Sequence, residues 1–407
     1  METEWWRSGD PEPESSVLLR AGNIMKNGGL VAFPTETVYG LGGDAFNPGS
    51  SQKIYAAKGR PSDNPLIVHI CRISDMEKAA REIPEEAYLL ADSFWPGPLT
   101  MILKKQPDLP RETTGGLDTV ALRFPSHELA QKLIDAAGGF VAAPSANTSG
   151  RPSPTEGKYV YEDLAGRIEM LLDDGLASLG LESTIVDLTE AVPTILRPGF
   201  VTLEMIQKVL PDAVLDPALR PGSYPKPAST DTAMVETGHT DGSGKEKENS
   251  VEKAEDRGCK ETLRDTAQQG LHPKAPGMKY KHYAPKGEVT IVKGQGESLH
   301  RYLAEALQQT RAEGKKSGLI IPKETEEGIL LQLQNCNQNS AKLADSVKIT
   351  GNLTDAEESA HSLFQFLREF DDEGIDVIYA QAVPEDGIGL AVMNRLKKAA
   401  GGRIVEI

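Results

Sequence analysis

The sequence predicts an α/β protein with two domains, and three observations support that class. At 407 residues the chain is long enough for two or three separate hydrophobic cores. Short apolar runs alternate with amphipathic helical stretches, most regularly after residue 287, which predicts a small and mostly parallel sheet there. Between the two parts, residues 217–276 are too rich in polar and small side chains to bury a core. We therefore expect a first domain at 1–216, a disordered linker at 217–276 and a second domain at 277–407.

The first domain is organised around residues 30–65. An apolar run at 30–33 predicts a buried strand, and two threonines, Thr35 and Thr37, follow its end. A glycine cluster within residues 40–43 comes next, where the backbone can approach a ligand closely. A short helix is expected at 51–58, capped by the preceding serine and ended by the following glycine.

Lys58 and Arg60 are predicted to leave the end of this helix side by side. Two cations on a stiff turn, near a threonine-lined strand end, suit an anionic ligand. The alternative is that Lys58 only complements the helix dipole and Arg60 is an ordinary solvated residue. A GxGxxA match at residues 40–45 does not indicate a dinucleotide site, because residues 47–49 separate its glycines from the helix.

The strand expected at 119–124 alternates in an informative way. Thr119, Ala121 and Arg123 share one face, and the apolar residues between them share the other. A polar face with a small residue in its middle leaves room for a ligand. An ordinary strand with one solvated face fits the same alternation.

The remaining elements follow from the same patterns. Further strands of the first domain are expected at 66–70, 101–103, 140–143, 181–188 and 194–199, and helices at 76–83, 85–94 and 127–137. The loop at 144–155 is stiff and polar, as ligand-binding loops at strand ends often are. In the second domain we expect strands at 288–292, 318–322, 376–380 and 403–407. Helices are expected around 299–307, from a capping box of Thr354 and Glu357 to an end at Gly374, and at 391–400.

Composition limits the kind of protein. A net charge of -16 argues against broad nucleic-acid binding, although a small basic cleft for a phosphate-bearing ligand is compatible with it. No apolar run is long enough to span a bilayer, and the N-terminus does not resemble a secretory signal, so we expect a cytoplasmic protein with no membrane partner. The cysteines and histidines are scattered, so neither a disulfide framework nor a dedicated metal site is expected.

With these residues laid out, the first domain resembles the L-threonylcarbamoyl-AMP synthase (YrdC-like) family. The resemblance rests on motifs in order, namely PTETVYGLG from Pro34, KGRP from Lys58, NPLIVHI from Asn64, the ALRFP segment, PSANTSG from Pro144, ESTIVD from Glu182 and RPG from Arg197. KYKHYAP and DGIGLAVMNRL, both beyond residue 276, resemble the extra C-terminal domain of the longer members. The resemblance implies a YrdC-like twisted open-sheet catalytic domain and a smaller Rossmann-like α/β domain.

The resemblance also implies an activity. A nucleotidyltransferase of this family converts L-threonine, bicarbonate and ATP to threonylcarbamoyl-AMP and pyrophosphate. The product would pass to the tRNA threonylcarbamoyl-transfer machinery, which modifies the adenosine next to the anticodon. Mg²⁺ is expected to arrive with ATP, since no carboxylate cluster stands out to bind it alone.

Residue roles follow from the same resemblance. The paired KxR and SxN signature reads Lys58, Arg60, Ser145 and Asn147, with Lys58 and Arg60 expected to be catalytic. ATP would be bound by Arg60, Asn64, Thr119, Ser145, Asn147, Ser153, Arg197 and Tyr283. Threonine would be bound by Thr35, Thr37, His69, Arg123, Ala143 and Ser183.

Several alternatives stay open at this point. A lone histidine such as His69 is often a satisfied core residue. The stretch 279–285 would be either a lid over the cleft or the packed edge of the second domain. The whole protein could instead be an RNA-binding module, or a carbamoyltransferase-like enzyme with another acceptor. Direct binding of tRNA is not decided by these motifs.

Overall fold

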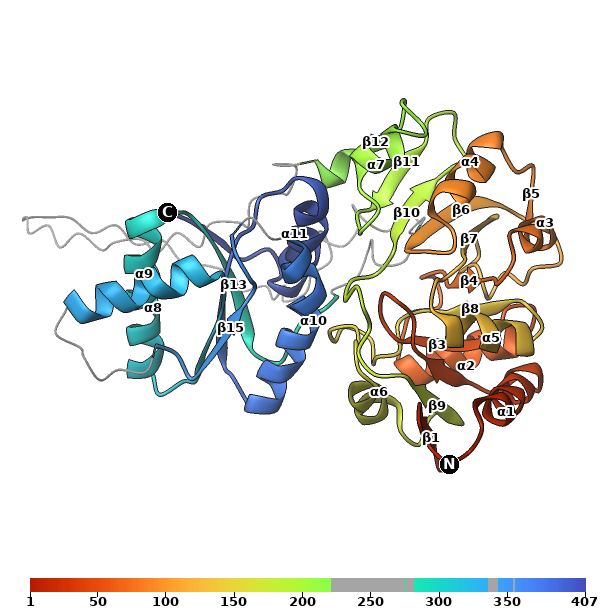
Figure 1. The fold of residues 1–407 in the computed structure, drawn as a ribbon, viewed down its shortest axis with the longest axis horizontal. Coiled ribbons are helices and arrows are strands. Elements are labelled where there is room, and N and C mark those ends of the chain that lie inside the picture. The colour runs from red at the N-terminus through yellow and green to blue at the C-terminus, as the bar shows by residue number, and fades with distance from the viewer. Residues whose placement is uncertain (221–274, 276–281, 336–342, 354–355) are drawn as a thin grey trace, which may run out of the picture. The chain divides into compact units, whose positions relative to one another are not determined.

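The computed structural model describes residues 1–220, 275, 282–335, 343–353 and 356–407, all of which belong to one compact unit. These residues form two sheets with helices packed on them, so the predicted α/β class is confirmed (Figure 1). The expected linker at 217–276 lies almost wholly outside the described residues, and its disorder stays a prediction. Within the described ranges, no helix is long and apolar enough to cross a membrane.

The first sheet is mixed and has 12 strands. They are β1 Glu4–Arg7, β2 Val31–Phe33, β3 Gly40–Asp44, β4 Ile67–His69, β5 Ala80–Arg81, β6 Leu99–Lys105, β7 Thr119–Arg123, β8 Val141–Ala143, β9 Met170–Asp173, β10 Thr184–Asp187, β11 Thr194–Arg197 and β12 Val214–Leu215. Their order is β1-β9-β2-β3-β8-β4-β7-β6-β10-β11-β12, with β5 paired to β6. At its centre β4 runs parallel to β7 and antiparallel to β8.

Helices cover both faces of this sheet. They are α1 Glu14–Lys26, α2 Pro48–Lys58, α3 Met76–Ala79, α4 Glu85–Phe94, α5 Glu128–Ala136, α6 Gly157–Leu164 and α7 Leu203–Gln207, with 3₁₀ turns η1 Ile73–Asp75 and η2 Pro217–Leu219. The amphipathic helices α1 and α5 pack together against one face, where Leu18 and Leu133 join Val31 and Val141. Helices α2, α4 and α6 bury their apolar sides in the larger cluster on the other face. The sequence patterns did not predict α1, α6, β1 or β9.

The structure corrects three local predictions. Helix α2 begins at Pro48, and its cap is Asn47, whose side chain accepts a hydrogen bond from the Gly49 amide, rather than Ser50. At Gly42, in strand β3, packing rather than a ligand explains the glycine, because a Cβ there would lie 2.7 Å from a Val141 methyl. The helix expected at 76–83 lasts one turn, because the chain at Ala80 turns to pair with β6.

The second sheet is parallel throughout its described pairs. Its strands are β13 Glu288–Lys293, β14 Ser317–Ile321, β15 Ser346–Ile349, β16 Val377–Gln381 and β17 Ile404–Glu406, and its helices are α8 Gly296–Ala312, α9 Lys323–Asn335, α10 Ala356–Glu373 and α11 Gly387–Ala399. The strand order is β15-β14-β16-β13-β17. Helices α8 and α9 cover one face, and α10 and α11 cover the other (Figure 1). The predicted small parallel α/β domain is therefore confirmed, with α9 and β15 added. The capping-box residue Thr354 lies outside the described residues.

Candidate active site

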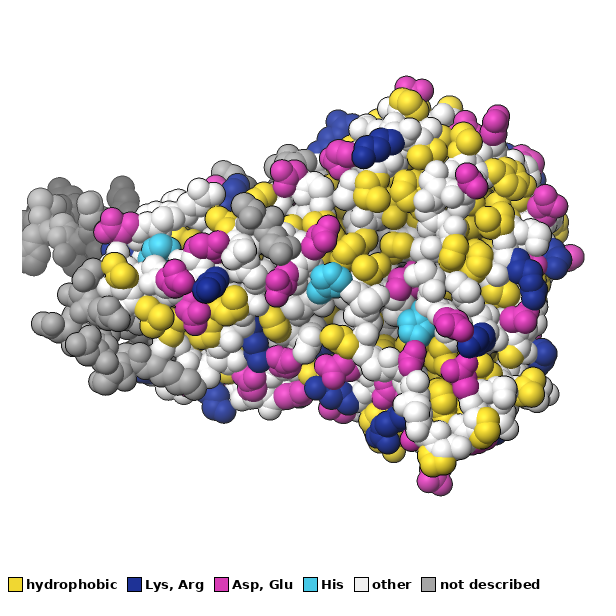
Figure 2. Space-filling model, in the orientation of Figure 1, with side chains coloured by type: hydrophobic (Ala, Val, Ile, Leu, Met, Phe, Trp, Pro, Cys, Tyr) yellow, Lys and Arg dark blue, Asp and Glu magenta, His cyan; other side chains and the backbone are white. Residues whose placement is uncertain are grey.

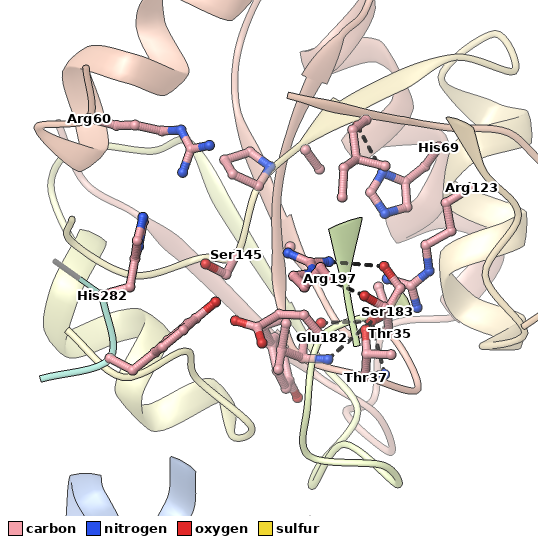
Figure 3. A pocket seen from close by; sticks show the side chains of 17 residues that line it. Thr35, Thr37, Arg60, His69, Arg123, Ser145, Glu182, Ser183, Arg197 and His282 are labelled. Carbon is pink, nitrogen blue, oxygen red and sulfur yellow. Dashed lines mark hydrogen bonds between the residues drawn. The ribbon is translucent and has the colours of Figure 1, made fainter. Parts of the chain in front are cut away.

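A polar pocket lies where several strands of the first sheet end. Its lining consists of Thr35, Thr37, Val38, Tyr39, Gly40, Arg60, Ile67, His69, Arg123, Ala143, Pro144, Ser145, Glu182, Ser183, Arg197, His282 and Tyr283. All of the residues predicted to bind threonine are among them, together with Arg60, Ser145, Arg197 and Tyr283 from the predicted ATP set. Figure 3 shows His69 and Arg123 at one end of the pocket, with Arg60 and His282 at the other.

Arg123 lies at the end of β7 and is paired with a residue that the sequence patterns did not single out. Its Nη2 is 2.8 Å from Oε1 of Glu36, and the two residues are only 4% and 5% exposed. The Glu36 carboxylate oxygens have no hydrogen-bond partner among the described residues, so the guanidinium charge is what compensates their burial. Glu36 lies in the PTETVYGLG motif between the two predicted threonines, and that position was its only sequence signal.

Arg197 and Ser183 meet across the antiparallel pair β10 and β11. Arg197 donates from Nε to the Ser183 carbonyl at 3.0 Å and from Nη2 to the Ser183 hydroxyl at 3.1 Å. That hydroxyl also lies 2.7 Å from the hydroxyl of Thr100. Burial lowers the pKa of Arg197 to about 10, and Glu182 acts in the opposite direction. A guanidinium removed from water in this way interacts strongly with any anion that enters the pocket.

The hydroxyls of Thr35 and Thr37 form a small hydrogen-bond network. The Thr35 hydroxyl donates to the Val38 carbonyl at 2.7 Å and lies 2.8 Å from the Thr37 hydroxyl. His69, also in the lining, is buried, with Nδ1 3.1 Å from the Ile67 carbonyl. Burial, followed by the nearby Arg123, lowers the pKa of His69 to about 3, so its ring is neutral at physiological pH. His69 is thus both a satisfied buried residue and part of the pocket lining.

Lys58 joins the two halves of the KxR and SxN signature, but it does not line the pocket. It is 3% exposed, and its ammonium donates to the backbone carbonyls of Ser145 and Asn147. Burial, with a smaller contribution from Arg60, lowers the pKa of Lys58 well below its usual value. The end of α2 is therefore tied directly to the loop after β8, and Lys58 is not the solvated dipole partner of the alternative interpretation.

Arg60 and Ser145 face the pocket from these two segments. Arg60 is half-buried and donates from Nε to the Asn64 carbonyl at 3.3 Å and from Nη2 to the Pro65 carbonyl at 3.1 Å. Ser145 donates to the Asn147 side-chain oxygen at 2.6 Å. The SxN loop is thereby held in one conformation beside Arg60.

Four of the residues predicted to bind ATP do not line the pocket, namely Asn64, Thr119, Asn147 and Ser153. Asn64, Asn147 and Ser153 are buried, and the Ser153 hydroxyl donates to Oε1 of the lining residue Glu182 at 2.7 Å. Thr119 is half-buried at the first position of β7. The open space expected beside it is filled, because Ala121 packs in an apolar cluster with Ile102 and its neighbours.

Glu182 from the first domain and His282 and Tyr283 from the second also line the pocket. Among the described residues, Glu182 is the only acidic one that lines the pocket, and it was not among the predicted site residues. Tyr283 has an unusual φ of 65°, is 4% exposed and lies with its ring 5.0 Å from the ring of Phe364 in α10. Burial and then Glu182 raise the pKa of Tyr283 to about 12. Tyr283 therefore both lines the pocket and packs in the core of the second domain, while residues 279–281 of the expected lid lie outside the described residues.

The charges define the kind of ligand. Three arginines and one glutamate of the described residues line the pocket, so this part of the lining carries a net positive charge. Hydroxyls and backbone from strand ends surround them, as in sites for small anionic ligands. Fold and pocket together define an α/β protein with a polar pocket whose net positive lining suits a small anionic molecule.

Comparison with known proteins gives the family. The Sua5/YciO/YrdC family model, described as telomere recombination, matches residues 23–199, and the model described as the threonylcarbamoyl-AMP synthase C-terminal domain matches residues 201–401. Threonylcarbamoyl-AMP synthase of Pyrococcus abyssi is 43% identical over 97% of this chain and 96% of its own length. The Bacillus subtilis protein of the same name is 38% identical over 95% of this chain and 94% of its own length. The crystal structure of P. abyssi Sua5 complexed with L-threonine matches with a TM-score of 0.78 at 41% identity, covering 100% of both chains. The chain belongs to the threonylcarbamoyl-AMP synthase family and is an enzyme of that family.

Proposed function

We propose that this enzyme forms threonylcarbamoyl-AMP and pyrophosphate from L-threonine, bicarbonate and ATP. One observation carries the proposal. A single pocket contains the residues predicted to bind L-threonine, with His69 and Arg123 at one end and Arg60 at the other, and Arg197 also lines it (Figure 3). The names of the full-length relatives, and the threonine complex of the P. abyssi protein, support the same substrate.

Threonine would bind at the end that contains Arg123. The guanidinium can fork onto the threonine carboxylate, as arginines do on planar anions. Thr35, Thr37, His69, Ser183 and the Ala143 backbone would surround the rest of the molecule. Because His69 is neutral, it adds no charge to oppose a threonine amine. Reaction of that amine with bicarbonate releases water and leaves a carbamate.

ATP would bind at the end that contains Arg60. A carbamate oxygen attacks the α-phosphorus, and the bond from that phosphorus to the pyrophosphate oxygen breaks. Arg60 and Arg197 would offset the charge that develops on the phosphates, with Ser145 and Tyr283 beside them. Lys58 and Asn147 would act by holding the loop that follows β8 in place. The other residues predicted to bind ATP would support the binding of ATP without lining the pocket, namely Asn64, Thr119 and Ser153.

Mg²⁺ fits this site only as a partner of ATP. Among the described residues no cluster of three His, Cys, Asp or Glu side chains is arranged to hold a metal. In the part of the lining that the structure describes, Glu182 is the one carboxylate, so phosphate oxygens would supply most of the ligands for Mg²⁺. When bound, the ion would neutralise phosphate charge that the arginines do not reach.

The test is release of pyrophosphate from ATP by the purified full chain. Release that requires both L-threonine and bicarbonate, with threonylcarbamoyl-AMP found by mass spectrometry, would support the proposal. Release that depends on another acceptor would favour a carbamoyltransferase-like enzyme and contradict it. The product is expected to go to the tRNA threonylcarbamoyl-transfer machinery in the cytoplasm.

An RNA-binding role receives less support. On the face drawn in Figure 2, Lys and Arg side chains are scattered among Asp and Glu side chains rather than gathered into one basic patch. The net charge of -16 has the same implication for non-specific binding. If the chain bound RNA and showed no threonine-dependent pyrophosphate release, the RNA-binding alternative would replace our proposal.

A further inference from the structure

The carboxylate of Glu182 connects the pocket to the second domain. Its Oε1 accepts a hydrogen bond from the Ser153 hydroxyl at 2.7 Å, and its Oε2 accepts one from Nε of Arg395 at 3.1 Å. Arg395 lies on α11 and is separated from Glu182 by 213 residues. One oxygen of this carboxylate is thus hydrogen-bonded to Ser153, which is predicted to bind ATP, and the other to a side chain of the second domain.

Arg395 holds more than the carboxylate. It is 0% exposed, and its other nitrogens donate to the backbone carbonyl of Pro198 and, at 3.3 Å, to that of Glu182. Pro198 directly follows Arg197, and Glu182 directly precedes Ser183. A single buried guanidinium therefore links the two strand segments that place Arg197 and Ser183 in the pocket.

Because Glu182 is charged, losing its contact with Arg395 would also affect Arg197. Burial alone would raise the pKa of the Glu182 carboxyl, but Arg395, followed by Arg197, holds it below its usual value. A buried carboxylate that loses one cation attracts the other more strongly. Without Arg395, Glu182 would draw Arg197 away from Ser183 and neutralise a charge that ATP needs.

The neighbours of Glu182 are also packed against the second domain. The Tyr283 ring contacts Phe364, and a Cβ on Gly180 would lie 2.2 Å from the His361 carbonyl of α10. Leu181 belongs to the same hydrophobic cluster as α10 and α11. The segment that carries Glu182 therefore has little freedom to move independently of the second domain.

We propose that Arg395 is a positioning residue for the ATP end of the site, acting through Glu182. By holding this carboxylate, Arg395 directs the Ser153 hydroxyl and keeps Arg197 available to the phosphates. This role rests on the proposed function, and it makes the second domain part of the arrangement that binds ATP.

A double-mutant cycle on the full chain tests this role. Pyrophosphate release is measured against ATP and threonine concentration for the wild type, Arg395→Gln, Glu182→Gln and the double variant. We expect Arg395→Gln to lower kcat/KM for ATP by about 10- to 100-fold, as for a lost charge-assisted contact, and to change kcat/KM measured against threonine at saturating ATP much less. In the Glu182→Gln background the same change should have a clearly smaller effect, because the carboxylate is already neutral and only the contacts of Arg395 with the Pro198 and Glu182 carbonyls remain to be lost. If Arg395→Gln does not fold, Arg395→Lys, which keeps the buried cation, replaces it in the cycle.

Tyr159→Phe is the matched control. The Tyr159 hydroxyl donates to Asp372 of α10 at 3.1 Å, and neither residue lines the pocket, so the variant loses one contact with the second domain without touching Glu182. Its kinetics should equal those of the wild type. The inference is overturned if Arg395→Gln has the same kinetics as Tyr159→Phe. It is also overturned if the fold-losses in kcat/KM of Arg395→Gln and Glu182→Gln multiply in the double variant, or if Arg395→Gln lowers kcat/KM for threonine as much as kcat/KM for ATP. A wild-type chain without threonine-dependent release would overturn the proposed function and this inference together.

Discussion

The ammonium of Lys58, at the end of α2, is buried against the backbone carbonyls of Ser145 and Asn147. This contact makes one unit of the KxR turn and the SxN loop, although 87 residues separate Lys58 from Ser145. Arg60, two positions further on, lines the pocket instead. Lys58 and Arg60, the two cations of one signature, therefore differ in role. Lys58 holds the SxN loop, and Arg60 lines the pocket.

The first prediction separates these tasks. Arg60→Ala should lower kcat/KM for ATP by about 10- to 100-fold but should cost less stability than Lys58→Ala, because Arg60 is only half-buried and its two contacts with backbone carbonyls are only partly buried. Lys58→Ala should also lower activity, but it should cost about 1–3 kcal/mol of stability, since it leaves buried carbonyls without a donor. Urea denaturation and steady-state kinetics measure both quantities. Equal stability of the two variants would contradict the structural task of Lys58.

The second prediction concerns the ion pair of Glu36 and Arg123. Glu36→Gln leaves a buried guanidinium without its counter-charge, which should destabilise the protein by about 3–5 kcal/mol. L-Threonine supplies a carboxylate to Arg123, so it should raise the melting temperature of this variant more than that of the wild type. Glu82→Gln, which removes an exposed pair with Lys104, is the control and should leave stability nearly unchanged, because solvent screens that pair. A threonine effect that is identical in all three proteins would remove Arg123 from the threonine site.

The third prediction is a pH dependence that comes from His69. Its pKa is about 3 when folded and about 6.5 when unfolded, so the unfolded state binds more protons as the pH falls below 6.5. Stability is therefore lost on acidification, by about 2 kcal/mol from this group between pH 7 and pH 5. His69→Asn should show a correspondingly smaller loss over that range, measured by urea denaturation at both pH values. Parallel losses in variant and wild type would mean that His69 titrates normally.

The fourth prediction distinguishes the two roles of Tyr283. Tyr283→Phe retains the ring contact with Phe364 and removes only the hydroxyl that faces Glu182, so it should keep the melting temperature and lower kcat/KM for ATP. Tyr283→Ala also removes a buried ring and should cost about 3–5 kcal/mol. If segment 279–285 is a lid, Tyr283→Ala should in addition consume ATP without a matching yield of threonylcarbamoyl-AMP. Normal coupling of ATP use to product in a destabilised Tyr283→Ala protein would leave packing as its only role.

Local patterns were enough to predict most of the elements that carry the site. The apolar run before Thr35, the alternation that puts Arg123 on the face of Ala121, and the strand pair holding Ser183 and Arg197 are all short-range features. Strand β2 forms where expected because its apolar run is buried between the clusters on both faces of the sheet. Strands β7, β10 and β11 instead place alternate apolar side chains in the larger cluster and in a smaller one around Ile102. The motifs that resemble the family lie in and just after these elements, so the resemblance and the strand pattern indicated the same place in the chain.

The charge partners of the site were decided only by tertiary structure. No local period relates Glu36 to Arg123, Lys58 to the Ser145 carbonyl, or Glu182 to Arg395, whose side chains meet across 213 residues. Each of these groups is buried by the packing of separate segments, and burial is what obliges a charge to find a partner. Sequence alone determined which side chains stand at the strand ends. Packing decided which of them face the pocket and which hold their neighbours in place, because desolvation depends on everything that surrounds a group.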